Sequence, residues 1–204
     1  GVGKTTLARL LKEHFEAELQ LEVFEENPFL ADFYDDRARY AFQTQMFFLL
    51  SRYHQQRRSV RDVVDAGKPL LTDYTFAKDA LFAGLNLEGD ELDMYYKVHE
   101  ALGEKVRLPD LVVYLQADTD VLMQRIAQRD RVYERNMDPA YIAALARSYD
   151  DHFTVNYNGP PVLAVNTNTL NYVASQDDLA TVVTMIEDAL AQTPRQAQLP
   201  LSAD

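Results

Sequence analysis

The stretch that decides the fold is GVGKTTLARLL, residues 1–11. Gly3-Lys4-Thr5 matches the end of the phosphate-binding motif G-x-x-x-x-G-K-[ST], whose first glycine would lie before Gly1. The leucines that follow have helical spacing, so the glycine loop leads directly into an amphipathic helix. Such a loop binds phosphate oxygens through backbone N–H groups and the helix dipole. We therefore expect a nucleoside triphosphate at Gly1, Val2, Gly3, Lys4, Thr5 and Thr6.

Two side chains of this loop have expected chemical roles. Lys4 is the cation that reaches the terminal phosphates and assists phosphoryl transfer, and the hydroxyl of Thr5 is a ligand for Mg²⁺. The alternative is a chance Gly-Lys-Thr at a helix start, but the surrounding alternation of strands and helices favours the motif. The predicted cofactors are ATP and Mg²⁺.

Strands and helices alternate along the whole chain, which predicts an open parallel α/β sheet with helices on both faces. The first strand should precede Gly1, so the chain is expected to begin inside the motif and the sheet to show a gap near its middle. We expect one domain over residues 1–192 and a flexible tail over 193–204. The expected strands lie near 20–25, 69–73, 111–116 and 162–166, and the main expected helices near 4–15, 37–66, 90–104, 139–153 and 177–190.

Composition narrows the class of partner. The 204 residues carry a net charge of −12 and contain no cysteine. A strongly acidic surface argues against nucleic acid or an anionic membrane as a partner. No apolar run approaches the ~20 residues that a membrane span needs. A reducing compartment is the simplest expectation without cysteine, so we expect a cytoplasmic protein.

Two acidic residues, Glu25 and Glu26, follow the expected strand at 20–25. The carboxyl end of that strand lies beside the phosphate site in a parallel sheet. A carboxylate there could accept the proton of an acceptor hydroxyl. The alternative is a solvated pair of loop residues.

A basic cluster stands out in this acidic chain. Arg125, Arg129, Arg131 and Arg135 lie within eleven residues, in a predicted lid over about 125–138. Guanidinium groups bind phosphoryl oxygens bidentately and offset the charge that develops during transfer. The alternative is a solvated helix face on which Asp130 and Glu134 are partners of these arginines.

A third set of polar residues comprises Gln45, Arg52 and Asp79. Gln45 and Arg52 are seven residues apart on the long predicted helix and therefore share a face. A glutamine amide can pair bidentately with a base edge, and an Arg–Asp pair could orient it. From these residues alone, unrelated surface polar positions are the favoured reading.

The order of these stretches resembles one family, the deoxynucleoside kinases that include deoxycytidine, deoxyguanosine and deoxyadenosine kinases. The resemblance runs from Gly1 to about Phe153, and its specificity comes from the joint spacing. The bacterial purine-deoxynucleoside branch is the most similar, through ENPFLADFY and DYTFAKD. The stretches that carry the resemblance are GVGKTT, the glutamate-rich turn, FQTQMFFLLSR, DYTFAKD and RIAQRDRVYE, followed by Tyr141.

The resemblance implies transfer of the γ-phosphoryl group of a nucleoside triphosphate to the 5′-hydroxyl of a deoxyribonucleoside, as a step of nucleotide salvage. It implies that Glu25 is the general base, with Glu26 as the alternative, and that Asp73 lies on the magnesium side of the site. The remaining roles that it implies are base recognition by Gln45, Arg52 and Asp79, binding of the sugar 3′-hydroxyl by Tyr34 and Glu134, and lid cations at Arg125, Arg129 and Arg131.

The chain departs from the family pattern in two places. Better-known members have an acidic residue followed by Arg at the end of the third strand, whereas here Asp73 is followed by Tyr74. Lys78 is the candidate substitute for that arginine. Tryptophan is absent, so Phe29 or Phe33 would form the aromatic wall of the base pocket.

Two other functions are alternatives to a deoxynucleoside kinase. A thymidylate-kinase-like enzyme would need cations near the acceptor phosphate, but residues 19–36 contain no Lys or Arg. A non-catalytic P-loop switch would need a water-positioning residue and a partner surface, and neither is identifiable.

The expected acceptor is a purine deoxynucleoside, and the sequence favours deoxyguanosine and deoxyadenosine almost equally. The apolar surface of the helices near 37–66 and 90–104, and the family resemblance, also predict a homodimer.

Overall fold

The computed structural model describes residues 1–23, 26–155 and 157–193. The main helices are α1 (Lys4–His14), α2 (Leu30–Asp35), α3 (Arg37–Ser59), α4 (Ala77–Asn86), α5 (Gly89–Gly103), α6 (Thr119–Arg129), α7 (Pro139–Asp150) and α8 (Gln176–Gln192). The strands are β1 (Glu18–Gln20), β2 (Leu70–Thr72), β3 (Val112–Gln116) and β4 (Val162–Asn166). A 3₁₀ turn, η3 (Val132–Glu134), follows α6.

The strands form two parallel pairs. β1 pairs with β2 in the register Leu19 opposite Leu71, and β3 pairs with β4 in the register Tyr114 opposite Ala164. Each connection between paired strands contains helices, as parallel pairing requires. The parallel α/β fold predicted from the sequence is therefore confirmed.

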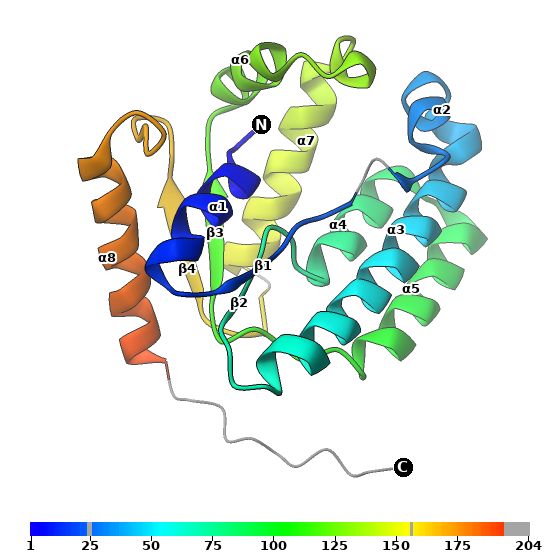
Figure 1. Cartoon of the computed structure of the whole chain (residues 1–204). Coiled ribbons are helices and arrows are strands. Elements are labelled where there is room, and N and C mark those ends of the chain that lie inside the picture. The colour runs from blue at the N-terminus through cyan, green and yellow to red at the C-terminus, as the bar shows by residue number, and fades with distance from the viewer. Residues whose placement is uncertain (24–25, 156, 194–204) are drawn as a thin grey trace.

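Helices cover both faces of the strands. Figure 1 shows α8 on the left of the strands, α3, α4 and α5 on the right, and α7 beside β3. Side chains of β3 alternate between the two faces, as the pleat dictates. Val113 and Leu115 belong to the core that α1 and α8 cover, whereas Val112 and Tyr114 pack with Phe153, just after α7.

The two strand pairs enclose a large cavity. No strand among the described residues pairs with the facing edges of β2 and β3. A cavity of about 1300 Å³ opens between them, lined by Leu71 of β2 and Val113 of β3, and reaches the glycine loop at Gly1 and Val2. The described strands therefore form two separate parallel pairs with this cavity between them.

Several boundaries differ from those predicted. β1 ends at Gln20, so the strand expected near 20–25 lies earlier in the chain. The long helix ends at Ser59 and continues as a π-helical turn over Val60–Val64. Residues 194–204, most of the predicted tail, lie outside the described residues. Within the described part of the chain, no helix is both long and apolar enough to cross a membrane.

Candidate active site

The glycine loop is shaped for phosphate binding at the start of α1. Gly3 immediately precedes the helix with φ of 98°, a left-handed conformation that favours glycine. A Cβ at Gly3 would also collide with the hydroxyl of Tyr172. Position 3 therefore requires glycine both for its backbone conformation and for space. Lys4, the first residue of α1, lines the cavity.

Asp73 links the phosphate loop to the segment after β1. Its Oδ2 accepts a hydrogen bond from the hydroxyl of Thr5, and its Oδ1 accepts one from the backbone N–H of Glu22 at 2.8 Å. Asp73 is buried directly after β2, which fixes it at the carboxyl end of the sheet. The structure thus brings together Thr5 and Asp73, the two predicted magnesium ligands.

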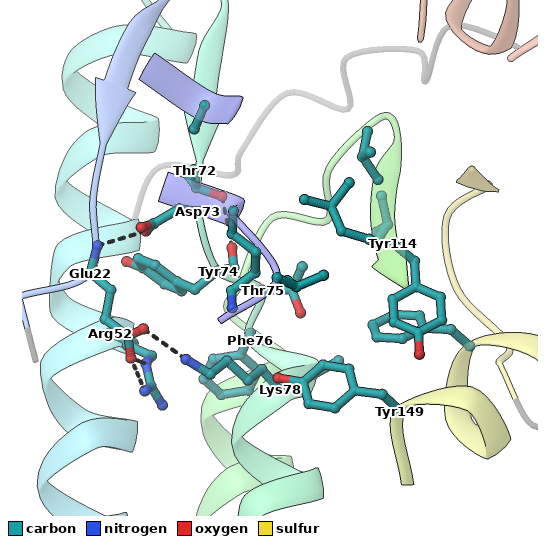
Figure 2. Close-up of a pocket in the computed structure, with 18 of the residues that line it drawn as sticks. Glu22, Arg52, Thr72, Asp73, Tyr74, Thr75, Phe76, Lys78, Tyr114 and Tyr149 are labelled. Atoms are coloured by element: carbon teal, nitrogen blue, oxygen red, sulfur yellow. Dashed lines mark hydrogen bonds and ion pairs between the residues drawn. The ribbon is translucent and has the colours of Figure 1, made fainter. Parts of the chain in front are cut away.

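Glu22 is the centre of a buried charge cluster that the sequence analysis does not predict. Its Oε1 accepts hydrogen bonds from Nε of Arg52 at 2.9 Å and from Nη2, and its Oε2 lies 2.7 Å from Nζ of Lys78 (Figure 2). Burial by itself raises the pKa of this carboxyl, but the Lys78 and Arg52 cations outweigh burial and lower the pKa of Glu22 well below its usual range. The carboxylate stays ionised at neutral pH.

Neither of the two glutamates predicted as bases is part of the described charge cluster around Glu22. Glu25 lies outside the described residues. Glu26 is exposed and is not among the residues that line the cavity. The strand ladder ends at Gln20, so Glu22 is the first acidic residue after it. That position at the strand end is the signal that could have identified Glu22.

The base-reading set assembles on one face of α3. Gln45 and Arg52 both line the cavity, and Nη1 of Arg52 forms an ion pair with the carboxylate of Asp79. Asp79 has 0% exposure and does not line the cavity, so it acts through Arg52. The ring of Phe48 lies 4.6 Å from the Arg52 guanidinium and further restricts it.

Two polar groups of α3 remain available to a ligand. Gln45 is only 3% exposed, and its amide has no hydrogen-bond partner within the described part of the chain. The hydroxyl of its neighbour Thr44 is also buried without a partner there. Buried polar groups are normally hydrogen-bonded, so two unpaired ones at a cavity wall point to a polar ligand.

Aromatic side chains supply the rest of the acceptor wall. Phe33 and Tyr34 of α2 line the cavity, whereas Phe29, the other candidate for the wall, is not among the lining residues. Additional aromatic residues that line the cavity come from α3, α4 and α7, namely Phe48, Phe82, Tyr141 and Tyr149.

The predicted lid arginines divide into two groups. Arg129 donates to Oε2 of Glu134 from Nε at 3.2 Å and from Nη2 at 2.5 Å, and Arg131 lies 3.8 Å from the other oxygen of Glu134. All three residues line the cavity. Arg125 instead bonds to Thr167, after β4, and is not among the lining residues.

Comparison with known proteins decides the family. The sequence pattern of the deoxynucleoside kinase family matches residues 1–191. The chain belongs to the deoxynucleoside kinase family. It is therefore a kinase with ATP as phosphoryl donor, as the sequence predicts.

Similar curated proteins span nearly the whole chain. A deoxyguanosine kinase of Bacillus subtilis is 29% identical over 193 residues, 93% of each chain. A deoxyguanosine kinase of Lactobacillus johnsonii is 30% identical, and the match covers 91% of this chain and 87% of that protein. A deoxyadenosine kinase of Lactobacillus acidophilus is 27% identical, and the match covers 94% of this chain and 93% of that protein.

A solved structure gives the same fold. The deoxyadenosine kinase of M. mycoides with bound dATP matches with a TM-score of 0.79 at 21% identity, over 92% of this chain and 95% of that one. This likeness confirms the P-loop kinase fold.

Proposed function

We propose that this kinase transfers the γ-phosphoryl group of ATP to the 5′-hydroxyl of a purine deoxyribonucleoside. One observation carries the proposal: a carboxylate held by two cations, Glu22, lines the same cavity as Lys4 of the phosphate loop and the unpaired amide of Gln45. A general base, a binding site for the phosphoryl donor and a group that can read the nucleobase are thus available to one bound acceptor.

In the chemical step the 5′-oxygen forms a bond to the γ-phosphorus while the bond from that phosphorus to the β–γ bridging oxygen breaks. ADP leaves, and the hydroxyl proton passes to the carboxylate of Glu22. We place the base at Glu22, in place of the expected Glu25 or its alternative Glu26, because Glu22 lines the cavity and stays ionised beside Lys78 and Arg52. A weakly basic carboxylate suits a loose transition state, in which the proton leaves late.

The cations of the cavity have divided roles. Lys4 would contact the terminal phosphates, and Arg129 and Arg131 would stabilise the transferring group once Glu134 shares them with the phosphoryl oxygens. Lys78 lies on the acceptor side and holds Glu22. The charge near the transferred group is therefore balanced without the arginine that Tyr74 replaces.

The residues present fit a magnesium ion. A hydroxyl and a carboxylate are hard oxygen donors, and Mg²⁺ commonly takes only one or two protein ligands besides water and phosphate. Thr5 and Asp73, already in contact, would hold it. When bound, Mg²⁺ neutralises phosphate charge. The described residues contain no larger cluster of acidic or histidine ligands.

Purine recognition is proposed from Gln45 and its neighbours. The amide offers a donor and an acceptor side by side, which suits the N6/N7 edge of adenine or, with another donor, O6/N7 of guanine. Arg52 adds a donor for a carbonyl such as O6. The named relatives act on deoxyguanosine or deoxyadenosine, which supports a purine and leaves the choice between them open.

The sugar would lie between α2 and the lid. Tyr34 and Glu134 both line the cavity and are the proposed partners of the 3′-hydroxyl. Glu134 is buried, and its carboxylate accepts a hydrogen bond from Arg129. One residue would therefore contact both the sugar and a lid cation.

We also propose a homodimer through α3 and α5. Leu50 of α3 is 41% exposed and Met94 of α5 is 51% exposed, although both are large apolar side chains. α3 and α5 pack against each other, so one surface could present both helices to a second copy.

The test of the function is a phosphorylation assay with labelled ATP and the four deoxyribonucleosides, with thymidine monophosphate as a fifth acceptor. We expect 5′-monophosphate products from deoxyguanosine or deoxyadenosine with the highest kcat/KM. Preference for thymidine, or for the monophosphate, would overturn the proposed acceptor. ATP binding without phosphorylation of any acceptor would favour a nucleotide switch.

A further inference from the structure

Arg125 is bonded to the sheet rather than directed into the cavity. Its Nη1 donates to Oγ1 of Thr167 at 2.9 Å, and its Nη2 donates to the backbone carbonyl of Thr167 at 2.7 Å. Thr167 directly follows β4 and has 0% exposure. Two donors of one planar guanidinium are thus fixed on one buried residue, an arrangement that a lysine cannot reproduce.

Thr167 in turn joins the ends of two strands. Its backbone N–H and its hydroxyl both donate to the carbonyl of Gln116, the last residue of β3, at 2.8 and 3.0 Å. The next residue, Asn168, accepts from the backbone N–H of Asp118 at 2.8 Å, just before α6 begins. Arg125 therefore anchors α6 to the carboxyl ends of both β3 and β4.

The same junction supports the phosphate loop. A Cβ at Gly1 would lie 2.8 Å from the carbonyl oxygen of Leu122 and 3.1 Å from the side chain of Ile126, so the loop packs directly on α6. From the segment after β4, the hydroxyl of Tyr172 approaches the carbonyl oxygens of Val2 at 3.3 Å and Gly3 at 3.5 Å. A shift of α6 against this segment would therefore disturb the phosphate loop.

We propose that Arg125 is a positioning residue for ATP, which acts through Thr167 and does not itself bind phosphate. It holds α6 in register with the phosphate loop, so that Arg129, one turn further along α6, is presented to the transferring group. This inference rests on the proposed function for the roles of Arg129 and of the phosphate loop.

A double-mutant cycle tests the proposal. Thr167→Val removes one acceptor and no charge, and we expect it to raise the KM for ATP ~3- to 10-fold, in keeping with one hydrogen bond to a charged group. Arg125→Met should raise it ~10- to 100-fold, since both bonds are lost. Arg125→Met already removes the bond that Thr167→Val breaks with Arg125, and the Gln116 carbonyl keeps its bond from the backbone N–H of Thr167. The double variant should therefore stay within ~2-fold of Arg125→Met. The deoxynucleoside KM should be unchanged in all three.

Conservative variants separate positioning from phosphate binding. Thr167→Ser keeps the hydroxyl and should behave as wild type, which also guards against a Thr167→Val variant that fails to fold. Arg125→Lys keeps the charge but not the two-pronged contact, so we expect it to be closer to Arg125→Met than to wild type. Amide hydrogen exchange over residues 119–125 should accelerate in Arg125→Met. The matched control is Arg9→Met, at an exposed arginine of α1, which should leave all these values unchanged.

Three results would overturn the positioning role. They are a Thr167→Val variant with wild-type ATP KM, additive effects in the double variant, or an Arg125→Lys variant that retains near wild-type ATP KM. Calorimetry without any acceptor measures the MgATP affinity of the wild type, the two single variants and the double variant. It therefore repeats the double-mutant cycle without any turnover. If no deoxynucleoside is phosphorylated, the proposed function fails, but this binding cycle still decides the role of Arg125.

Discussion

The Nζ of Lys78 lies 2.7 Å from Oε2 of Glu22, so a side chain from the second residue of α4 neutralises a carboxylate that follows β1 (Figure 2). The sequence left open which cation compensates for Tyr74 in place of arginine. The geometry supports Lys78, because Tyr74 is buried and its hydroxyl is bonded to Gln20 and Gln55 instead.

This ion pair predicts a pH dependence. Burial lowers the pKa of Lys78 to about 8, against the opposing effect of Glu22. The lysine therefore loses its charge as pH rises through about 8, and Glu22 loses one of its two counter-ions. We expect kcat/KM for the deoxynucleoside to fall above that pH. Arg at this position stays charged, so Lys78→Arg should move the decline upward. An identical alkaline limb in both proteins would contradict this assignment.

Lys4→Ala should abolish phosphoryl transfer and leave the fold intact. The reason is that Lys4 lines the cavity and is not part of the apolar core, so its loss removes charge and little packing. The measurements are initial rates and the circular-dichroism spectrum of the variant. Activity close to wild type would show that the loop is not the donor site.

Asp79→Ala should alter base selectivity more than ATP affinity. Asp79 holds Arg52 on the helix face that also carries Gln45, and its removal leaves Glu22 as the ion-pair partner of the guanidinium. Loss of a buried ion-pair partner costs ~3–5 kcal/mol, so Asp79→Asn provides a milder companion variant. Steady-state kinetics on deoxyadenosine, deoxyguanosine, deoxycytidine and thymidine give the ranking. If the order of the four acceptors is unchanged in both variants, the proposed base pocket is wrong.

The proposed dimer predicts a concentration-dependent mass. Light scattering should report twice the chain mass at micromolar concentration. Met94→Lys places a charge in the proposed apolar interface and should shift the protein to monomer, whereas Lys12→Glu, on α1, should not. A monomeric wild type would remove the proposal.

Much of the donor side was predictable because its signals are local. The glycine loop and α1 are contiguous in sequence, and the strands over 112–116 and 162–166 have continuous apolar runs with sharp ends. Gln45 and Arg52 share a helix face by spacing alone. These features depend on helix and strand periods, which a single sequence carries.

What the sequence did not reveal depends on contacts between distant segments. LQLEVF alternates well past Gln20, which predicts a strand that includes Glu22, whereas β1 ends where its partner β2 ends at Thr72. The spacing of Arg125 and Arg129 predicts that both belong to one lid cluster. Arg125 instead bonds to Thr167, which lies 42 residues further along the chain, and no local sequence pattern predicts this contact.

The central claim is that Glu22 is the base of a deoxynucleoside kinase, and its most direct test is a comparison of Glu22→Gln with Glu26→Gln. Both variants remove one negative charge, but only Glu22 lies in the charged cluster of the cavity. The measurement is kcat for deoxyguanosine and deoxyadenosine at saturating MgATP, together with MgATP affinity by calorimetry. We predict that Glu22→Gln lowers kcat ~100-fold or more with little change in MgATP affinity, as expected for loss of a general base, and that Glu26→Gln stays near wild type. Near wild-type turnover by Glu22→Gln, with the loss in Glu26→Gln instead, would contradict the account.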